Sequence, residues 1–328
     1  MSLRCCERKR AVLPALVFSL AVPVSLHAQP WVLPQSEGSV SVLYQNIHVR
    51  DHLFSDGSRR DVGHIRTHNT LVDVDYGLTD RWSLSASLPF VAAKFHGPSR
   101  SAHTHADGRT LDNGSYHPAF QDLRVDVRYS SIEFPVAVTP FVALNLPTHD
   151  YEFFAHSAVG LGLTEAQVGA YVGAVRAPLY VQGRYSYGLS ERVIGRRRSR
   201  SNIDTEVGWF IKPSIRVFAF QLGQISHGGL EIFPGFPNLT SEEVLHHDPL
   251  GRANILDVGG GVAVGLTPSM DLLCGAVTTI AGANTHAVQY GLTVGASWTF
   301  GRRVARHGSG SASSSRNTYL PLSSARVN

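Results

Sequence analysis

Charged side chains of both signs alternate with apolar ones in the segment DLRVDVRY, which begins at Asp122. Residues two apart on a β-strand point to the same side, so Asp122, Arg124, Asp126 and Arg128 are expected to form one ladder of mixed charge. Such a ladder lining a pore sets ion preference, and the same ladder can also close on itself as a salt-bridged plug. Both interpretations stay open. Six further charged residues hold equivalent positions in other alternating segments: Asp73, Asp75, Arg184, Asp204, Glu206 and Asp257.

Histidines form a second group with possible chemistry. His103, His105 and Asp107 lie within the Gly- and Ser-rich stretch 96–118. Neutral imidazoles in an H-x-H pair suit Zn, Ni or Cu. A metal site needs fixed geometry, however, and a solvated surface loop is the favoured interpretation. His246, His247 and Asp248 have a weaker claim of the same kind, and no metal or cofactor is predicted.

An enzyme needs a nucleophile beside a base, and Ser226–His227 is the one pair that invites this reading. Adjacent strand residues point to opposite faces, so the two side chains are not expected to form a dyad. No third orienting group stands at a defined spacing, and no phosphate-binding glycine loop or paired-cysteine motif is present. The sequence therefore predicts a protein that is not an enzyme, with an outer-membrane lipid-modifying enzyme as the weakest alternative.

The first 28 residues read as an export signal. Arg4, Arg8, Lys9 and Arg10 precede the apolar run 11–26, which is too short and Pro-interrupted to favour a membrane-spanning helix. Cys274 is the one cysteine after this segment, so no intrachain disulfide is expected. The formal net charge is +4. The excess of basic residues lies in the signal and in the tail 301–328, which leaves the body negatively charged and argues against nucleic acid as a partner.

Twelve segments of alternating apolar and polar residues follow the signal, each near the length of a tilted membrane strand. They span residues 38–49, 65–77, 81–95, 119–131, 135–147, 164–176, 178–189, 201–212, 214–226, 253–266, 269–281 and 285–300. Two of them, 214–226 and 269–281, are apolar on both faces, so alternation does not show which face points to the lumen. Short turns alternate with longer connections, which predicts a meander with tight periplasmic turns and long extracellular loops. The long connections are 50–64, 96–118, 148–163, 190–200, 227–252 and the brief 282–284.

Aromatic residues end the apolar faces near the short turns, as in a membrane-interface girdle. They are Tyr76, Trp82, Tyr129, Trp209, Trp298 and Phe300. A charge on the lipid face costs about 2–4 kcal/mol at mid-membrane, so the charged faces must point to the lumen. We therefore predict an all-β, transmembrane, up-and-down antiparallel barrel of about twelve strands over 38–300. It is preceded by a lead-in, 29–37, and followed by a disordered Ser- and Arg-rich tail, 301–328. A secreted soluble β domain is the alternative.

Six stretches resemble a known family of outer-membrane β-barrels, the MetA-pathway-of-phenol-degradation transporter family. They are YGLTDRWSLSASLPFV from Tyr76, FQDLRVDVRYS from Phe120, NLPTHDY from Asn145, APLYVQGRYSYG from Ala177, AGANT from Ala281 and YGLTVGASWTF from Tyr290. The resemblance covers roughly Ser36 to Phe300. The family usually has Gly where Gln121 and Thr148–His149 stand here, and it ends on its last aromatic, whereas 28 residues, 301–328, follow Phe300.

The resemblance implies passage of small molecules, apolar or aromatic ones among them, across the bacterial outer membrane. Outer-membrane lipid, the barrel-assembly machinery and a small-molecule solute are the expected partners. A porin-like transporter is thus the predicted function, and a closed structural or adhesive barrel with His-rich loops is the alternative.

Overall fold

The structure is a computed structural model that describes residues 29–97, 108, 110, 112–151, 155–234 and 237–301. No helix within these ranges has the length and apolar character needed to cross a membrane. The export signal, the H-x-H pair with Asp107, and all of the tail beyond Gly301 lie outside the described residues.

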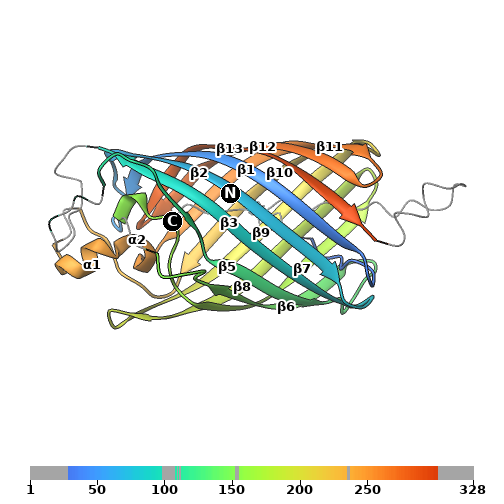
Figure 1. Cartoon of the computed structure of the whole chain (residues 1–328), viewed down its shortest axis with the longest axis horizontal. Helices are drawn as coiled ribbons and strands as arrows, with labels where there is room; N and C mark the ends of the chain where they lie inside the picture. The colour runs from blue at the N-terminus through green and yellow to red at the C-terminus, as the bar shows by residue number, and fades with distance from the viewer. Residues whose placement is uncertain are drawn as a thin grey trace, which may run out of the picture.

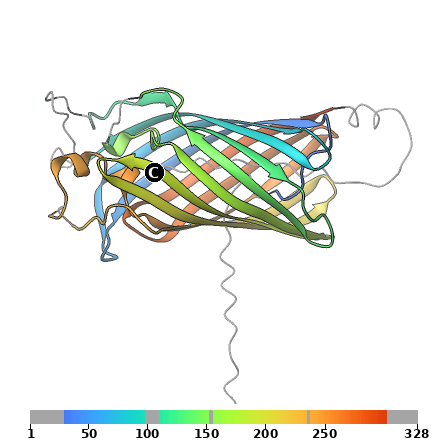
Figure 2. The same cartoon turned by 90° about the horizontal axis from the view of Figure 1, so that it is seen from below.

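Long antiparallel strands pair in chain order and close into a barrel, because the first strand hydrogen-bonds to the last. Figure 1 and Figure 2 show the strands tilted steeply around a long axis. The strands are β1 (Gly38–Leu53), β2 (Arg59–Gly77), β3 (Trp82–His96), β4 (His117–Phe120), β5 (Leu123–Tyr129), β6 (Ala137–Leu146), β7 (Glu165–Arg176), β8 (Leu179–Val193), β9 (Arg196–Lys212), β10 (Ile215–Ser226), β11 (Asn254–Thr267), β12 (Met270–Ala283) and β13 (Thr285–Phe300).

The thirteen strand segments form twelve barrel strands, because β4 and β5 both pair with β3 and occupy one position in the barrel. We call each of these twelve barrel strands a stave. Gln121 and Asp122 form a break between them. The predicted strand 119–131 is therefore divided. The closed antiparallel barrel of twelve strands is confirmed, including the two segments that were apolar on both faces.

Two of the predicted long connections are mostly strand. β1 and β2 leave only residues 54–58 between them, and β8 and β9 leave only Ile194 and Gly195. Both stretches are rich in charged and small residues, a composition that is typical of a loop. At the end of a barrel, however, a hairpin can extend into water, where neither face has to be apolar.

Side chains alternate between a buried inner face and an exposed outer face along β1, β2 and β3, and β6 to β10 show much the same pattern. In β1, Ser41, Leu43 and Gln45 are buried, while Val42 and Tyr44 between them are exposed. The outer surface of the staves is rich in exposed Val, Leu, Ile and aromatic side chains. Burial is thus inverted relative to a soluble sandwich, in which the apolar face is the covered one.

The outer face offers a test of this inversion. Val142, in the middle of β6, is 61% exposed, and Val142→Arg would place a charge in hydrocarbon. We expect unfolding measured in lipid vesicles to show a loss of about 2–4 kcal/mol of stability. Leu179→Arg at the turn-end rim of β8 is the control, with an expected loss of about 0–1 kcal/mol. Equal small losses would place both residues in water.

One end of the barrel has the short turns, and the other has the longer connections with η2 (Ala155–Ser157), α1 (Ser241–Leu245) and α2 (His247–Leu250). We call these the turn end and the loop end. Leu163, Leu230 and Leu250 form a small core at the loop end, and α2 contacts both η2 and β9. The described parts of the connections before β7 and before β11 thus pack together at this end, which lies at the left of Figure 2.

Candidate functional site

The barrel interior contains most of the predicted charged residues, and its two sides differ. β5 to β9 carry the ion pairs, whereas β10, β11, β12, β1 and β2 carry a cluster of apolar side chains. The order of strands in the closed sheet places these two groups of staves on opposite sides. The interior therefore has a charged wall and an apolar wall.

The ladder on β5 is buried and internally paired. Arg128 Nε lies 2.6 Å from Asp126 Oδ1, and Arg124 Nε lies 3.3 Å from Asp126 Oδ2. Arg128 also reaches Asp75 on β2 at 3.6 Å and lies over the Tyr171 ring at 4.7 Å. Ser85 donates a hydrogen bond to Asp75. These contacts join staves that the sequence separates by about fifty residues.

A second set of pairs lies on β8 and β9. Arg184 forms an ion pair with Asp204, which faces it across the two strands. Tyr180 donates a 2.5 Å hydrogen bond to Glu206, and Gln182 donates another at 3.2 Å. Both carboxylates are nearly inaccessible to solvent, at 1% for Asp204 and 4% for Glu206. A buried carboxylate is tolerable only when it is paired or hydrogen-bonded in this way.

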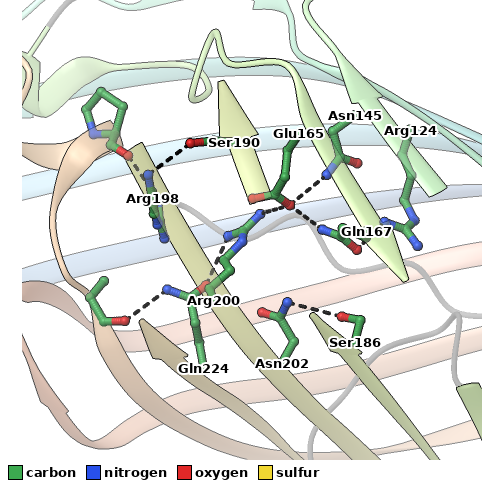
Figure 3. A network of polar contacts seen from close by, with 12 residues as sticks. Arg124, Asn145, Glu165, Gln167, Ser186, Ser190, Arg198, Arg200, Asn202 and Gln224 are labelled. Atoms are coloured by element: carbon green, nitrogen blue, oxygen red, sulfur yellow. Dashed lines mark hydrogen bonds and ion pairs between the residues drawn. The ribbon is translucent and has the colours of Figure 1, made fainter. Parts of the chain in front are cut away.

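A third network, which the sequence pattern did not predict, lies closer to the loop end (Figure 3). Glu165 Oε1 accepts hydrogen bonds from Asn145 at 3.1 Å, from Arg200 at 2.9 Å and from Gln167. Arg200 also donates to Gln224 at 3.0 Å. The network thus links β6, β7, β9 and β10 around one carboxylate.

Two further contacts extend that network. Arg124 donates to Gln167 at 2.7 Å, and Arg198 donates to the Pro249 carbonyl of α2 at 3.1 Å. The only available signal for Arg198 and Arg200 was their charge, and the loop assignment of 190–200 concealed which way they point. Once that stretch is a strand, its alternation places both side chains inside.

The remaining predicted lumen residues have three different environments. Asp73 and Asp257 are buried on β2 and β11, and Thr279 donates a 2.6 Å hydrogen bond to Asp257. Asp122 lies in the break between β4 and β5 and accepts a 2.6 Å hydrogen bond from Tyr151. Burial and the adjacent Asp122 charge raise the pKa of the Tyr151 phenol, so this tyrosine remains a donor across the whole physiological range.

Apolar side chains line the opposite wall and were not predicted as site residues. Seven of them pack as one buried cluster: Leu43, Leu71, Phe218, Phe220, Leu222, Ala263 and Leu273. A Cβ at Gly259 would lie 2.2 Å from the Phe220 ring, and one at Gly261 would lie 2.5 Å from the Phe218 ring. Only glycine lets the rings approach the wall this closely. The signal was present in the sequence, since segments 214–226 and 269–281 were apolar on both faces.

Several further side chains on the inner face are buried. Besides the carboxylates, Tyr171 and Thr139 are fully buried on the inner face of β7 and β6. Residues before β1 contribute, because Thr139 donates a hydrogen bond to the Pro30 carbonyl and Gly173 faces Pro30 and Trp31. Leu33 and Pro34 lie against Gly77 at the end of β2. The lead-in 29–37 thus crosses the interior at the turn end.

The six predicted interface aromatics all lie at the turn end, where strands begin or finish. Gly38 pairs with both Tyr76 and Phe300, Leu179 pairs with Trp209, and Met270 pairs with Trp298. The rings of Trp82 and Tyr129 lie 4.8 Å apart. All but Tyr129 are exposed, a placement consistent with the predicted girdle.

The proposed nucleophile and base point apart. Ser226 is buried and donates to the Ala253 carbonyl at 2.8 Å, whereas His227 is exposed and lies 2.8 Å from Ser201 Oγ. The two side chains therefore do not form a dyad, for the reason that strand alternation gives.

The architecture has known counterparts. The chain is similar to a COG4313 outer membrane channel from Pseudomonas putida F1, with a TM-score of 0.64 and 14% sequence identity over 83% of this chain and 98% of that channel. The fold is that of an outer-membrane β-barrel. The translocator domain of the autotransporter NalP from Neisseria meningitidis resembles it less, with a TM-score of 0.46 and 12% identity over 82% of this chain and 90% of that domain.

No protein-family model matches the chain, and no curated protein sequence matches it. Membership of the phenol-degradation transporter family therefore stays a prediction.

Proposed function

We propose that this protein is an outer-membrane barrel for the passive passage of small molecules, with apolar or aromatic compounds among its solutes. The observation that carries the proposal is the two-sided interior. Charged residues on one wall orient the polar part of a solute, and the Phe218–Phe220 wall opposite contacts its apolar part. Ligand sites are commonly built this way, from apolar surface with a few placed polar groups. The resemblance to the phenol-degradation transporter family supports the same solute class.

The proposal also includes location and partners. The apolar outer face supports insertion among outer-membrane lipids, and the aromatic residues at the turn end support a position at the membrane interface. The proposed route is passage out of the cytoplasm by way of the export signal, followed by insertion by the barrel-assembly machinery, with Phe300 as the final aromatic of the barrel. Membrane fractionation combined with a gel of boiled and unboiled samples tests this part. Recovery of the mature chain as a compact, detergent-free soluble protein would contradict it.

One observation favours a second candidate, a closed structural barrel. The ion-paired side chains leave almost no solvent-accessible surface on the charged wall, as Asp126 at 2% and Arg128 at 5% show. Passage then requires these side chains to move. Liposome swelling with small sugars separates the two candidates, because a sealed barrel gives no swelling.

The β5 ladder gives the sharper test. Arg124→Ala and Arg128→Ala each remove one positive charge from the interior, so we expect a shift of ion permeability toward cations in planar bilayers. Arg59→Ala is the matched control, since Arg59 pairs with Asp51 at the rim and is 55% exposed. Currents unchanged in both interior variants would remove the ladder from the conduction path.

A further inference from the structure

Four histidines and two aspartates gather at the loop end, outside the networks described above. His52 ends β1 and His286 begins β13, where the two residues face each other in the closing pair of strands. His247 and Asp248 come from α2, and His156 comes from η2. The sixth residue is Asp112, which lies in the connection before β4. Five separate stretches of chain thus contribute to one cluster.

The cluster is buried and its imidazoles are in contact. His52 and His247 are 1% and 0% exposed, and His286 is 7% exposed. The ring centroids of His52 and His286 lie 4.6 Å apart, and those of His52 and His247 lie 5.9 Å apart. One ring nitrogen from each of the three lies within 4.8 Å of the others. Metal coordination requires ring nitrogens from several imidazoles to lie close together, as these three do.

Hydrogen bonding fixes which nitrogen of His247 carries the proton. Its Nδ1 lies 2.5 Å from the Val244 carbonyl, which can only accept, so Nδ1 carries the proton. Nε2 of a neutral ring then has a lone pair, yet it faces Asp248 Oδ1 at 3.2 Å. His286 Nε2 lies 3.1 Å from that same oxygen. Two electron pairs at this distance repel unless a cation, either a proton or a metal ion, lies between them.

Two polar atoms are left over in the cluster. His52 Nε2 and Asp248 Oδ2 are buried and have no hydrogen-bond partner among the described residues. Each such atom carries an unfavourable desolvation cost, because burial removes its hydrogen bonds to water. Coordination would satisfy them and would use the Asp248 charge to balance that of the ion.

We propose that His52, His247 and His286, with the Asp248 carboxylate beside them, bind one divalent transition-metal ion of the zinc class. Tetrahedral zinc with Zn–N bonds of about 2.0–2.1 Å sets neighbouring ligands about 3.4 Å apart. The three nitrogens therefore have to close by on the order of 1 Å. His156, held by Asp112 at 3.1 Å and in ring contact with both His247 and His286, buttresses the site from outside. Such outer contacts orient metal-binding imidazoles.

Metal would fasten α2 to the ends of β1 and β13. Since the Pro249 carbonyl of α2 also accepts from Arg198 of the interior network, the ion would hold the loop end against the top of the lumen.

Zinc titration of the full mature barrel in detergent, after chelator treatment, tests the site. We expect one saturable zinc per chain, and cobalt substitution giving the visible absorption of a tetrahedral site. His247→Ala should abolish saturable binding, and Asp248→Asn should weaken it about 10- to 100-fold. Boiled and unboiled gels establish that each variant is folded. His247 and Asp248 lie in a connection rather than in a stave, so barrel closure does not depend on them.

Two controls make the result specific. His149→Ala removes an exposed loop histidine and should leave zinc affinity unchanged. The pair His103→Ala with His105→Ala removes the H-x-H motif and should leave it unchanged as well. Absence of saturable binding by the folded wild-type barrel would overturn the proposal, and so would binding that survives His247→Ala but is lost with the H-x-H motif.

Discussion

Asp204→Ala is expected to lower the free energy of unfolding by about 3–5 kcal/mol, because it leaves the Arg184 guanidinium buried without its counter-charge. Arg184 and Asp204 are only 10% and 0% exposed at their side chains. Urea titration in lipid vesicles measures the effect. Asp61→Ala provides the control, since its pair with Arg50 is half exposed on both sides and should be worth about 0–1 kcal/mol.

A second variant separates the loss of a pair from the burial of a charge. Replacing both partners, Asp204→Leu with Arg184→Met, leaves no unpaired charge, so most of the stability should return. If Asp204→Ala and Asp61→Ala cost the same, water reaches the charged wall and the Arg184–Asp204 pair is not buried.

Phe218→Ala combined with Phe220→Ala should widen the interior. Both rings are 6% exposed and form the centre of the apolar cluster. Removing a buried Phe typically costs about 3–5 kcal/mol, so we expect a marked loss of stability together with faster liposome swelling by small neutral solutes. The loss of stability and the faster swelling have one cause, because the volume left by the two rings is both a cavity in the packing and space for a solute.

Phe90→Ala is the matched control, because this ring is of the same type but is exposed on the outer face of β3. It should leave swelling unchanged. Folded double-variant barrels that swell liposomes no faster than wild type would show that the apolar wall does not limit passage.

Alternation, together with the order of short turns and longer connections and the aromatic residues near the short turns, was enough to predict the fold. The lipid-facing side of a strand has to be apolar and the side facing a paired interior has to be polar, so successive residues must alternate. In a segment such as WSLSASLPF the sequence therefore shows which residues face the lipid. The segments apolar on both faces were ambiguous for a physical reason that the structure supplies. Phe218, Phe220 and Leu273 face an interior that is apolar on that side, and a rule that assumes a polar lumen cannot assign them.

Strand boundaries and long-range side-chain contacts were harder to predict from the sequence than the fold. At the break formed by Gln121 and Asp122, Asp122 accepts a hydrogen bond from Tyr151, which lies 29 residues further along the chain, and the alternation of the strand itself does not indicate this contact. Arg198 and Arg200 were hidden by the loop assignment, because a hairpin projecting into water has no apolar face to reveal it.

The histidine cluster shows most clearly which sites cannot be predicted from the sequence. His52 and His286 are 234 residues apart and become neighbours only when the barrel closes. His103 and His105 were candidate metal ligands because they are close in sequence, and they lie outside the described residues. Sequence proximity favours local motifs, whereas this cluster needs closure of the sheet and the packing of α2 and η2 above it.

The lead-in has a mechanical consequence for the turn end. Pro30 is held at the inner face of β6, and Pro34 lies against the last residue of β2, only four residues further along the chain. Four extended residues reach at most about 14 Å. The segment therefore sets an upper limit on how far β2 and β6 can separate at the turn end while both contacts hold.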